Sequence, residues 1–211
     1  MTFWFAIKIK IKETRMNTRR NLNTFTTILI LTLTALLAVS ASAAETYKLD
    51  PGHTSVVYRV KYQGVTFVYG RFNGPTGMFV FDEASPSNSS VTMQVDANNI
   101  DTAVEKRDNH LKSPDFFNAG EHPLVTFKST SVKKVDSDTY QVSGNLTLLG
   151  KSRMLTVTAK HTGAGKDPWG NFRRGFESSF TIKRSDFGMD FMLGGISDEV
   201  GITVSVSGIR Q

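Results

Sequence analysis

Apolar and polar residues alternate with a period of two along much of the chain after residue 44. Between residues 200 and 207, for example, Val200, Ile202, Val204 and Val206 are separated by glycine or hydroxyl residues. Successive side chains of a β-strand point to opposite faces, so this pattern is typical of antiparallel strands with one buried side. We expect such strands within residues 55–62, 79–81, 91–95, 140–148, 155–160, 176–183 and 200–207.

Turn-forming residues separate these segments. They lie at Asn73-Gly74-Pro75, Ser85-Pro86-Ser87, residues 163–170 and Gly194-Gly195. Many short strands at regular spacing predict an all-β fold, either a barrel or a sandwich. An antiparallel barrel of about eight strands has an interior that holds either side chains or one ligand.

One segment, from about Thr102 to Leu111, indicates a short helix. Asp101 or Thr102 would cap its N-terminus, and Glu105 would occupy the acidic position of a capping box. With no repeat and no linker in the sequence, residues 44–211 are expected to form a single domain.

The run from Arg107 to Phe117 is the most distinctive part of the chain, since it combines charges, His110 and two adjacent phenylalanines. Buried aromatic residues usually belong to a core, so Phe116 and Phe117 would plug the barrel in the simpler interpretation. In the alternative, the two rings form a lid over a pocket, and Arg107 and His110 lie near a ligand head group.

The first 43 residues have the layout of a targeting segment. A basic region with Arg15, Arg19 and Arg20 precedes an uncharged stretch over residues 25–39, and Ala41-Ser42-Ala43 forms a small-residue cleavage motif. This layout predicts a signal peptide over residues 16–43 that is cleaved after Ala43, and a mature protein in the periplasm. An uncleaved anchor is the alternative. Met16 would be the true start, with residues 1–15 upstream of it.

Most of the positive net charge of the chain lies in this leader. The formal net charge is +6, from 25 Lys and Arg against 19 Asp and Glu. Residues 1–43 contain six basic residues and one acidic residue, so residues 44–211 carry only +1. A nearly neutral domain lacks the basic surface of nucleic-acid-binding proteins. The absence of Cys excludes disulfides, thiol catalysis and thiolate metal sites.

Few residues suggest catalysis or metal binding. None of the four histidines forms a pair with the i, i+4 spacing of a helical metal site, and neither a Gly-x-Ser-x-Gly elbow nor a P-loop is present. We therefore expect no metal and no cofactor. An enzyme that acts on lipid-linked substrates, with His110 and either Asp108 or Asp115, remains an alternative because catalytic groups assemble through space.

Several motifs occur in the order found in one protein family. Asp50-Pro51-Gly52-His53-Thr54-Ser55 opens the series and the Arg107 to Phe117 run is part of it. With these motifs the chain resembles the YceI-like family of periplasmic polyisoprenoid-binding proteins over nearly all of residues 44–211. The other matching segments are residues 68–72, 99–102, 123–130, 144–148, 184–188 and 198–200.

This resemblance implies a lipocalin-like antiparallel barrel that binds a long isoprenoid lipid, either a polyprenyl chain or an isoprenoid quinone, without a cofactor. The apolar phase of the strands and the Arg107 to Phe117 run supply the candidate ligand-binding residues. They are Val56, Tyr58, Val60, Val68, Phe72, Phe79, Phe81, Met93, His110, Phe116, Phe117, Phe127, Leu146, Leu148, Phe180, Phe187 and Val204.

The expected partner is an isoprenoid lipid or another long-chain amphiphile, and no nucleic acid. Transient contact with a membrane surface or a membrane protein, and a homodimer, are compatible with this interpretation. Besides the enzyme, one alternative is a stress-related interaction protein whose barrel is packed solid with side chains. A continuous internal cavity would argue against that packed barrel.

Overall fold

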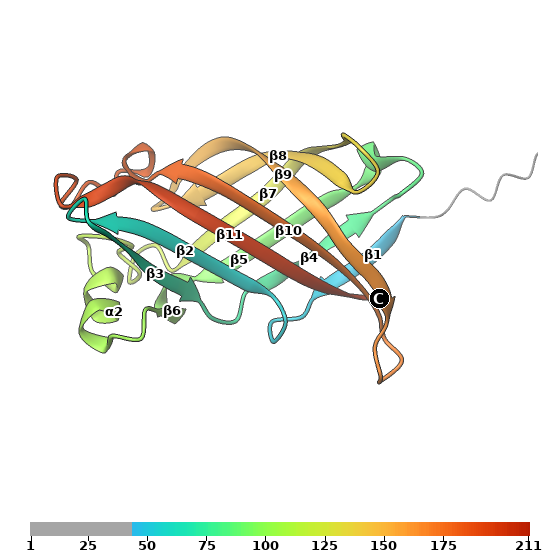
Figure 1. Cartoon of the computed structure of the whole chain (residues 1–211), viewed down its shortest axis with the longest axis horizontal. Coiled ribbons are helices and arrows are strands. Elements are labelled where there is room, and N and C mark those ends of the chain that lie inside the picture. Colours follow the sequence, from blue (N-terminus) through green and yellow to red (C-terminus); the bar gives the residue numbers. More distant parts are fainter. Residues whose placement is uncertain (1–43) are drawn as a thin grey trace, which may run out of the picture. The chain divides into compact units, whose positions relative to one another are not determined.

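The computed structural model describes residues 44–211, which form a β-barrel with one α-helix (Figure 1). The predicted leader lies outside the described residues. Within residues 44–211, no helix is both long and apolar enough to cross a membrane. The strands are β1 (Glu45–Leu49), β2 (Ser55–Tyr62), β3 (Thr66–Phe72), β4 (Thr76–Phe81), β5 (Ser90–Asp96), β6 (Ile100–Asp101), β7 (Leu124–Lys134), β8 (Thr139–Leu148), β9 (Lys151–Lys166), β10 (Phe172–Lys183) and β11 (Ile196–Arg210). The helix is α2 (Glu105–Lys112), and the 3₁₀ turns are η1 (Pro86–Asn88), η2 (Ala97–Asn99) and η3 (Arg184–Phe187).

Eight strands form a closed ring. Their order is β1-β4-β5-β7-β8-β9-β10-β11, and β11 returns to pair with β1. Every pair in the ring is antiparallel. The predicted antiparallel barrel of about eight strands with one short helix is therefore confirmed.

The long strand β11 carries two different partners along one edge. Its C-terminal part pairs with β1, where Leu49 lies opposite Gly208, and its earlier part pairs with β2, where Val56 lies opposite Val204. β3 and β6 continue the sheet beyond β2. These three strands extend the barrel wall past the end of β1, toward the end of the barrel where α2 lies (Figure 1).

The ladder between β9 and β10 covers only part of the two strands. It runs from the Phe172–Lys166 pair to the Glu177–Lys160 pair and contains a bulge at Gly175 and Phe176. Beyond Glu177 the contact continues through the Ser178 hydroxyl, which donates to the carbonyl of Thr158 at 2.7 Å. The barrel wall is therefore less tightly hydrogen-bonded toward the α2 end.

The helix begins later than the sequence predicted. α2 starts at Glu105, preceded by Val104, which makes no side-chain capping bond. Asp101 and Thr102 instead form a turn in which Asp101 Oδ1 accepts the backbone N–H of Ala103 at 2.9 Å. Ala103 has a φ of 61°. This left-handed residue separates both expected caps from the helix, so neither can serve it.

The turn predicted over residues 163–170 is also shorter than expected. β9 extends into it as far as Lys166, and residues 167–171 connect β9 to β10, which begins at Phe172. The Asp167 carboxylate organises this turn by accepting the backbone N–H groups of Trp169 at 3.0 Å and Asn171 at 2.9 Å. Gly163 and Gly165 are part of β9 instead, where they pair with Gly175 and Arg173 of β10, whereas Gly170 stays in the turn.

Strands β1, β3, β6 and β7 were not among the predicted segments. β3 shows why, since it is apolar on both faces: Val68 and Phe72 line the interior, whereas Phe67 and Tyr69 are exposed. A strand with two apolar faces has no alternation to detect.

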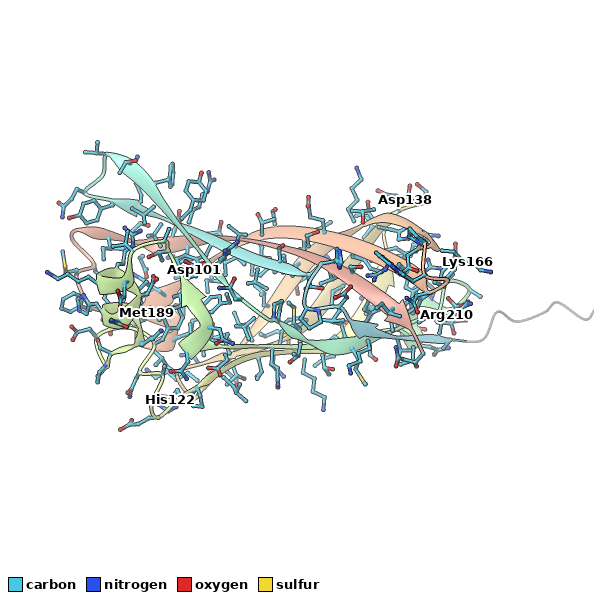
Figure 2. All side chains as sticks on the ribbon, turned by 90° about the horizontal axis from the view of Figure 1, so that it is seen from below. Asp101, His122, Asp138, Lys166, Met189 and Arg210 are labelled. Carbon is cyan, nitrogen blue, oxygen red and sulfur yellow. The ribbon has the colours of Figure 1, made fainter. Side chains whose placement is uncertain are left out.

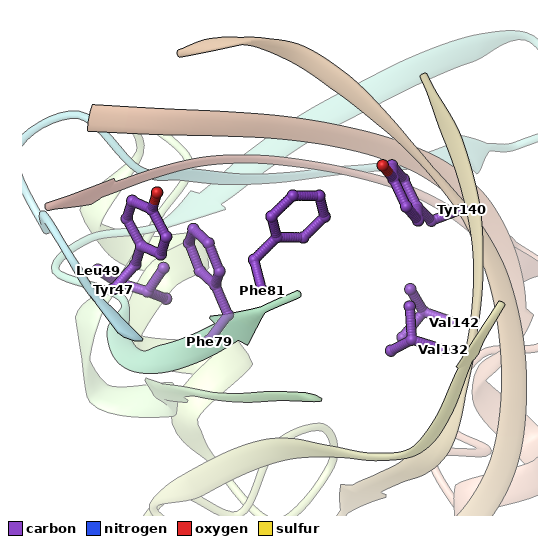
Figure 3. Close-up of a cluster of buried hydrophobic side chains, with 7 residues drawn as sticks. All are labelled: Tyr47, Leu49, Phe79, Phe81, Val132, Tyr140 and Val142. Carbon is purple, nitrogen blue, oxygen red and sulfur yellow. The ribbon is translucent and has the colours of Figure 1, made fainter. Parts of the chain in front are cut away.

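Buried side chains form three clusters inside the barrel. In the cluster of Figure 3, Tyr47, Phe79 and Phe81 lie across the interior from Val132 and Tyr140. The second cluster surrounds the inner face of β2, β3 and β5, and the third lies beneath α2 and η3. These clusters leave space between them, which becomes the candidate site.

Candidate ligand-binding cavity

A cavity of about 600 Å³ occupies the barrel interior. It extends from Phe81 and Tyr140 near one end to Tyr62 and Met192 near the other. Its volume lies within the range of about 300–1,000 Å³ that small-molecule sites have. The cavity argues against the packed-barrel alternative.

The candidate residues line this cavity with one exception. Residues of the predicted inward phase therefore face the interior as expected, although their contact with a ligand remains a prediction. The lining candidates are Val56, Tyr58 and Val60 on β2, Val68 and Phe72 on β3, Phe79 and Phe81 on β4, Met93 on β5, Phe127 on β7, Leu146 and Leu148 on β8, Phe180 on β10, Val204 on β11, and His110, Phe116 and Phe117 on α2 and the turn after it.

Phe187 is the exception, since the structure places it outside the cavity lining. Its side chain is 3% exposed and packs with Phe116, Leu148 and Met189, but it does not line the cavity. Phe187 lies in η3, beyond the end of β10, where the period-two rule for strands no longer applies. It supports Phe116 from behind.

Sequence reasoning missed Arg184, a buried residue of the cavity lining that is only 2% exposed. Its guanidinium donates to the backbone carbonyls of Met189 at 2.7 Å, Ile196 at 3.0 Å and Ser197 at 3.0 Å. Burial lowers the pKa of Arg184. The side chain ties both ends of the loop before β11 to the barrel wall. The Arg184-Ser185-Asp186-Phe187-Gly188 motif was the signal that could have identified it.

Aromatic rings form the floor of the cavity. Phe81 contacts Tyr140 and Phe176, with ring centroids 5.4 Å apart in both pairs. Behind them, the Arg174 guanidinium lies 4.4 Å from the Phe81 ring centroid and donates to the Tyr47 hydroxyl at 3.2 Å. A cation over an aromatic face is an attractive interaction, so this stack closes the floor without leaving Arg174 unpaired.

The opposite end is covered by two adjacent aromatic rings that point in different directions. Phe117 meets the barrel residue Phe72 edge to face at 5.4 Å. Phe116 packs against His110 at 5.1 Å and against Phe191 at 5.3 Å. One ring therefore joins the barrel wall, and the other joins the helix to the loop before β11.

A polar cluster lies where α2 meets the barrel. Arg107 Nε donates to Thr102 Oγ1 at 2.8 Å, and Asp108 Oδ1 accepts the backbone N–H of Thr102 at 2.9 Å. The Tyr58 hydroxyl is buried without a hydrogen-bond partner among residues 44–211. Burial raises the pKa of Tyr58, and the charge of Asp108 raises it further. The phenol therefore stays protonated and keeps an unused donor.

His110 Nε2 lies within hydrogen-bond distance of Asp115 Oδ2, at 2.7 Å, and both side chains are 47% exposed. No hydroxyl side chain in the described part of the chain hydrogen-bonds to His110, so the nucleophile–base pair of covalent catalysis is not assembled there. Asp108 is engaged with Thr102 instead. Residues 44–211 also contain no group of three or more His, Asp or Glu placed to hold a metal ion.

Comparison with known proteins shows which family this chain resembles. The family model described as YceI-like domain matches residues 47–208. A UPF0312 protein from Pseudomonas paraeruginosa is 44% identical over 179 residues, which cover 84% of this chain and 93% of the relative. A UPF0312 protein from Pectobacterium atrosepticum is 43% identical over 188 residues, covering 88% and 97%.

Solved structures share the barrel. The crystal structure of Burkholderia cenocepacia BcnA superimposes with a TM-score of 0.69 at 25% identity, covering 75% of this chain and 98% of that chain. A polyisoprenoid binding domain from Saccharophagus degradans, implicated in plant cell wall breakdown, superimposes with a TM-score of 0.62 at 15% identity, covering 78% and 98%. The latter likeness concerns the fold alone.

Proposed function

Because the chain belongs to the YceI-like family, we propose that its barrel binds a long isoprenoid lipid in the periplasm and carries or sequesters it. The observation that carries this proposal is the cavity of about 600 Å³, lined mostly by apolar side chains from every strand of the ring except β1. Such a lining gains free energy by desolvating an apolar chain.

The choice of an isoprenoid rests on the family and on the fold. The structure from Saccharophagus degradans is named for polyisoprenoid binding, and its barrel superimposes on this one. Branched aliphatic and aromatic side chains line the cavity here, including Val60, Val204 and Phe180. Family and neighbour both suggest a binding protein rather than an enzyme. The head group, a quinone or a polyprenyl derivative, is part of the proposal.

Energetics favour exchange over irreversible capture. Burying a lipid tail removes about 0.8 kcal/mol of unfavourable hydration per CH₂ group. For tens of carbons this sum exceeds the practical limit of non-covalent affinity, about −20 kcal/mol. The relevant competitor is a bilayer, which is equally apolar. Transfer between bilayer and barrel is therefore close to balanced, as a carrier requires.

The proposal is tested by identifying what the protein contains. The full chain, with its leader, is expressed in a Gram-negative bacterium, purified without detergent from the periplasmic fraction and extracted with organic solvent for mass spectrometry. We expect an isoprenoid lipid in wild type. A protein that contains no lipid, or only phospholipid acyl chains, would contradict the isoprenoid assignment.

Two substitutions on β8 provide a matched pair for this test. Leu146→Asp places a charge in the cavity lining and should abolish lipid loading or folding, whereas Asn145→Asp places one on the exposed face and should retain lipid. Equal lipid content in both variants would show that the interior is not the binding site.

The leader is tested by the same preparation. Intact-mass analysis of the periplasmic protein should give a chain that starts at Ala44, or within a residue or two of it, because Ala41-Ser42-Ala43 satisfies the small-residue rule for cleavage. A mass that includes Met1 or Met16 would favour an uncleaved anchor.

A further inference from the structure

Exposed apolar side chains gather at the α2 end of the barrel. Tyr62, Val65 and Phe67 lie on the β2–β3 hairpin, and Phe191, Met192 and Leu193 lie in the loop before β11. We call these six residues the hairpin patch. Val65 is 84% exposed and Phe67 is 47% exposed. Exposed apolar side chains that gather in one region mark an interaction site more often than isolated apolar residues do.

The two parts of the patch are held together by the backbone. The N–H of Gln63 at the hairpin tip donates to the carbonyl of Gly195 at 2.7 Å, and Tyr62 lies opposite Ile196 in the β2–β11 ladder. Figure 1 shows the hairpin beside the loop at the end of the barrel that carries α2, away from the C-terminus. Figure 2 shows the same end marked by Met189, and Arg210 at the other end.

The patch is continuous with the cavity. Tyr62, Phe191 and Met192 are exposed, and the same three residues line the cavity. An apolar path therefore leads from the surface of the patch to the barrel interior. A lipid that leaves a bilayer along this path would keep its tail out of water.

Cations flank the patch on the outer face of β2. The Arg59 guanidinium lies 4.7 Å from the Phe67 ring centroid, and the Lys61 ammonium lies 5.9 Å from it. Neither cation has an acidic partner within 4.0 Å in residues 44–211. Aromatic rings with basic side chains whose stems lie along apolar surface are typical of the membrane interface. Asp190 is exposed in the adjoining loop, so we expect the apolar contribution to dominate.

We propose that the hairpin patch docks onto the surface of a lipid bilayer that contains anionic lipid, with the β2–β3 hairpin inserted at the interface. This inference rests on the proposed function of the barrel as a lipid carrier. It specifies the surface through which cargo enters and leaves. A protein partner and a second copy of this chain are the other occupants that the experiment distinguishes.

The experiment measures binding to protein-free vesicles by flotation. Vesicles of phosphatidylcholine alone are compared with vesicles that also contain phosphatidylglycerol, using the mature protein. We expect wild type to bind both and to bind the anionic vesicles more tightly. Val65→Ser with Phe67→Ser should lower binding to both by roughly tenfold or more, since two inserted side chains lose their burial. Lys61→Gln should lower binding to the anionic vesicles only.

A matched control lies at the opposite end of the barrel. Trp169 is 76% exposed and belongs to the β9–β10 turn. Figure 1 shows this turn at the opposite end of the barrel from the β2–β3 hairpin. Trp169→Ser should leave vesicle binding unchanged. Equal losses in this control and in the hairpin variant would show that binding is not specific to the patch and would overturn the proposal.

Three further readouts separate the other outcomes. Wild type that binds neither vesicle overturns the proposal and favours a protein partner, and a concentration-dependent dimer that the hairpin variant abolishes assigns the patch to a second copy. The lipid content of each variant is measured in parallel. Docking that persists in a protein without isoprenoid lipid means that the proposed function fails while the docking surface stands. Wild-type protein that contains isoprenoid lipid but binds neither vesicle means the opposite, because the proposed function then stands while the docking surface fails.

Discussion

The phenol ring of Tyr58 lies directly over Gly70, its partner across the β2–β3 ladder. A β-carbon at position 70 would overlap the hydroxyl and two ring atoms of Tyr58. Glycine is thus required here by the close approach of a neighbouring side chain, and the hole it leaves decides where the Tyr58 hydroxyl lies.

The first prediction concerns this pair. Gly70→Ala should destabilise the protein by about 1–3 kcal/mol, because the ring must leave its place in a packed interior. Combining it with Tyr58→Leu should recover part of the loss, since the obstacle is removed. Denaturant unfolding of the two single variants and the double variant gives the coupling directly. Additive effects would mean that the two residues do not constrain each other.

Removing the Tyr58 hydroxyl should have the opposite effect. The group is buried without a hydrogen-bond partner among the described residues, and such a group costs about 1–3 kcal/mol. Tyr58→Phe should therefore leave the delipidated protein as stable as wild type or about 1 kcal/mol more stable, as measured by denaturant unfolding. A loss of stability would indicate that the hydroxyl has a partner in solution.

The two adjacent phenylalanines should behave differently. Phe116 is buried with Leu148, Phe187 and Met189, so Phe116→Ala should cost about 3–5 kcal/mol, like other large core truncations. Phe117 is half-buried against Phe72, and Phe117→Ala should cost less while speeding lipid exchange with vesicles. Thermal unfolding of both variants, and their rates of lipid exchange with vesicles, show whether the two rings plug the core or form a lid over the cavity. An unchanged exchange rate in folded Phe117→Ala protein would exclude the lid.

Acid should loosen the β9–β10 turn through Asp167. Burial raises the pKa of this carboxyl, but hydrogen bonds from Arg173, Asn171 and the backbone N–H groups outweigh it and lower the pKa from 3.8 to about 2. A lowered folded-state pKa contributes stability above the unfolded value, and that stability is lost as the pH falls from about 4 to 2. Asp167→Asn should lower stability at pH 7 and flatten the pH dependence of unfolding in that window. An unchanged slope would contradict this assignment.

The inward phase of the strands could be derived from the sequence alone. A strand has a period of two, and a shift of one residue would expose its whole apolar set, so the alternation of Leu146 and Val204 with polar neighbours already determined their direction. The same local rule predicted the all-β class, and the order of motifs identified the family. The strand direction and the fold class could be predicted because they depend on the relation of each residue to its immediate neighbours.

Tertiary contacts decided the remaining features. Phe187 follows the end of β10, so strand periodicity could not predict where its side chain points. Ala103 adopts a left-handed backbone, so the start of α2 could not be predicted from periodicity either. Phe67 is apolar and yet exposed, because β3 presents its other face to the cavity.

The cavity itself also required the structure. Alternation shows that one face of each strand avoids water, but it does not show whether the enclosed side chains meet. Phe81 and Tyr140 meet to form a floor, while Val60 and Phe180 remain on the wall of an open interior. The sequence by itself determined which side chains turn inward. The closure of β11 onto β1, and the space that this ring encloses, depend on contacts between residues more than 150 positions apart, which no local pattern encodes.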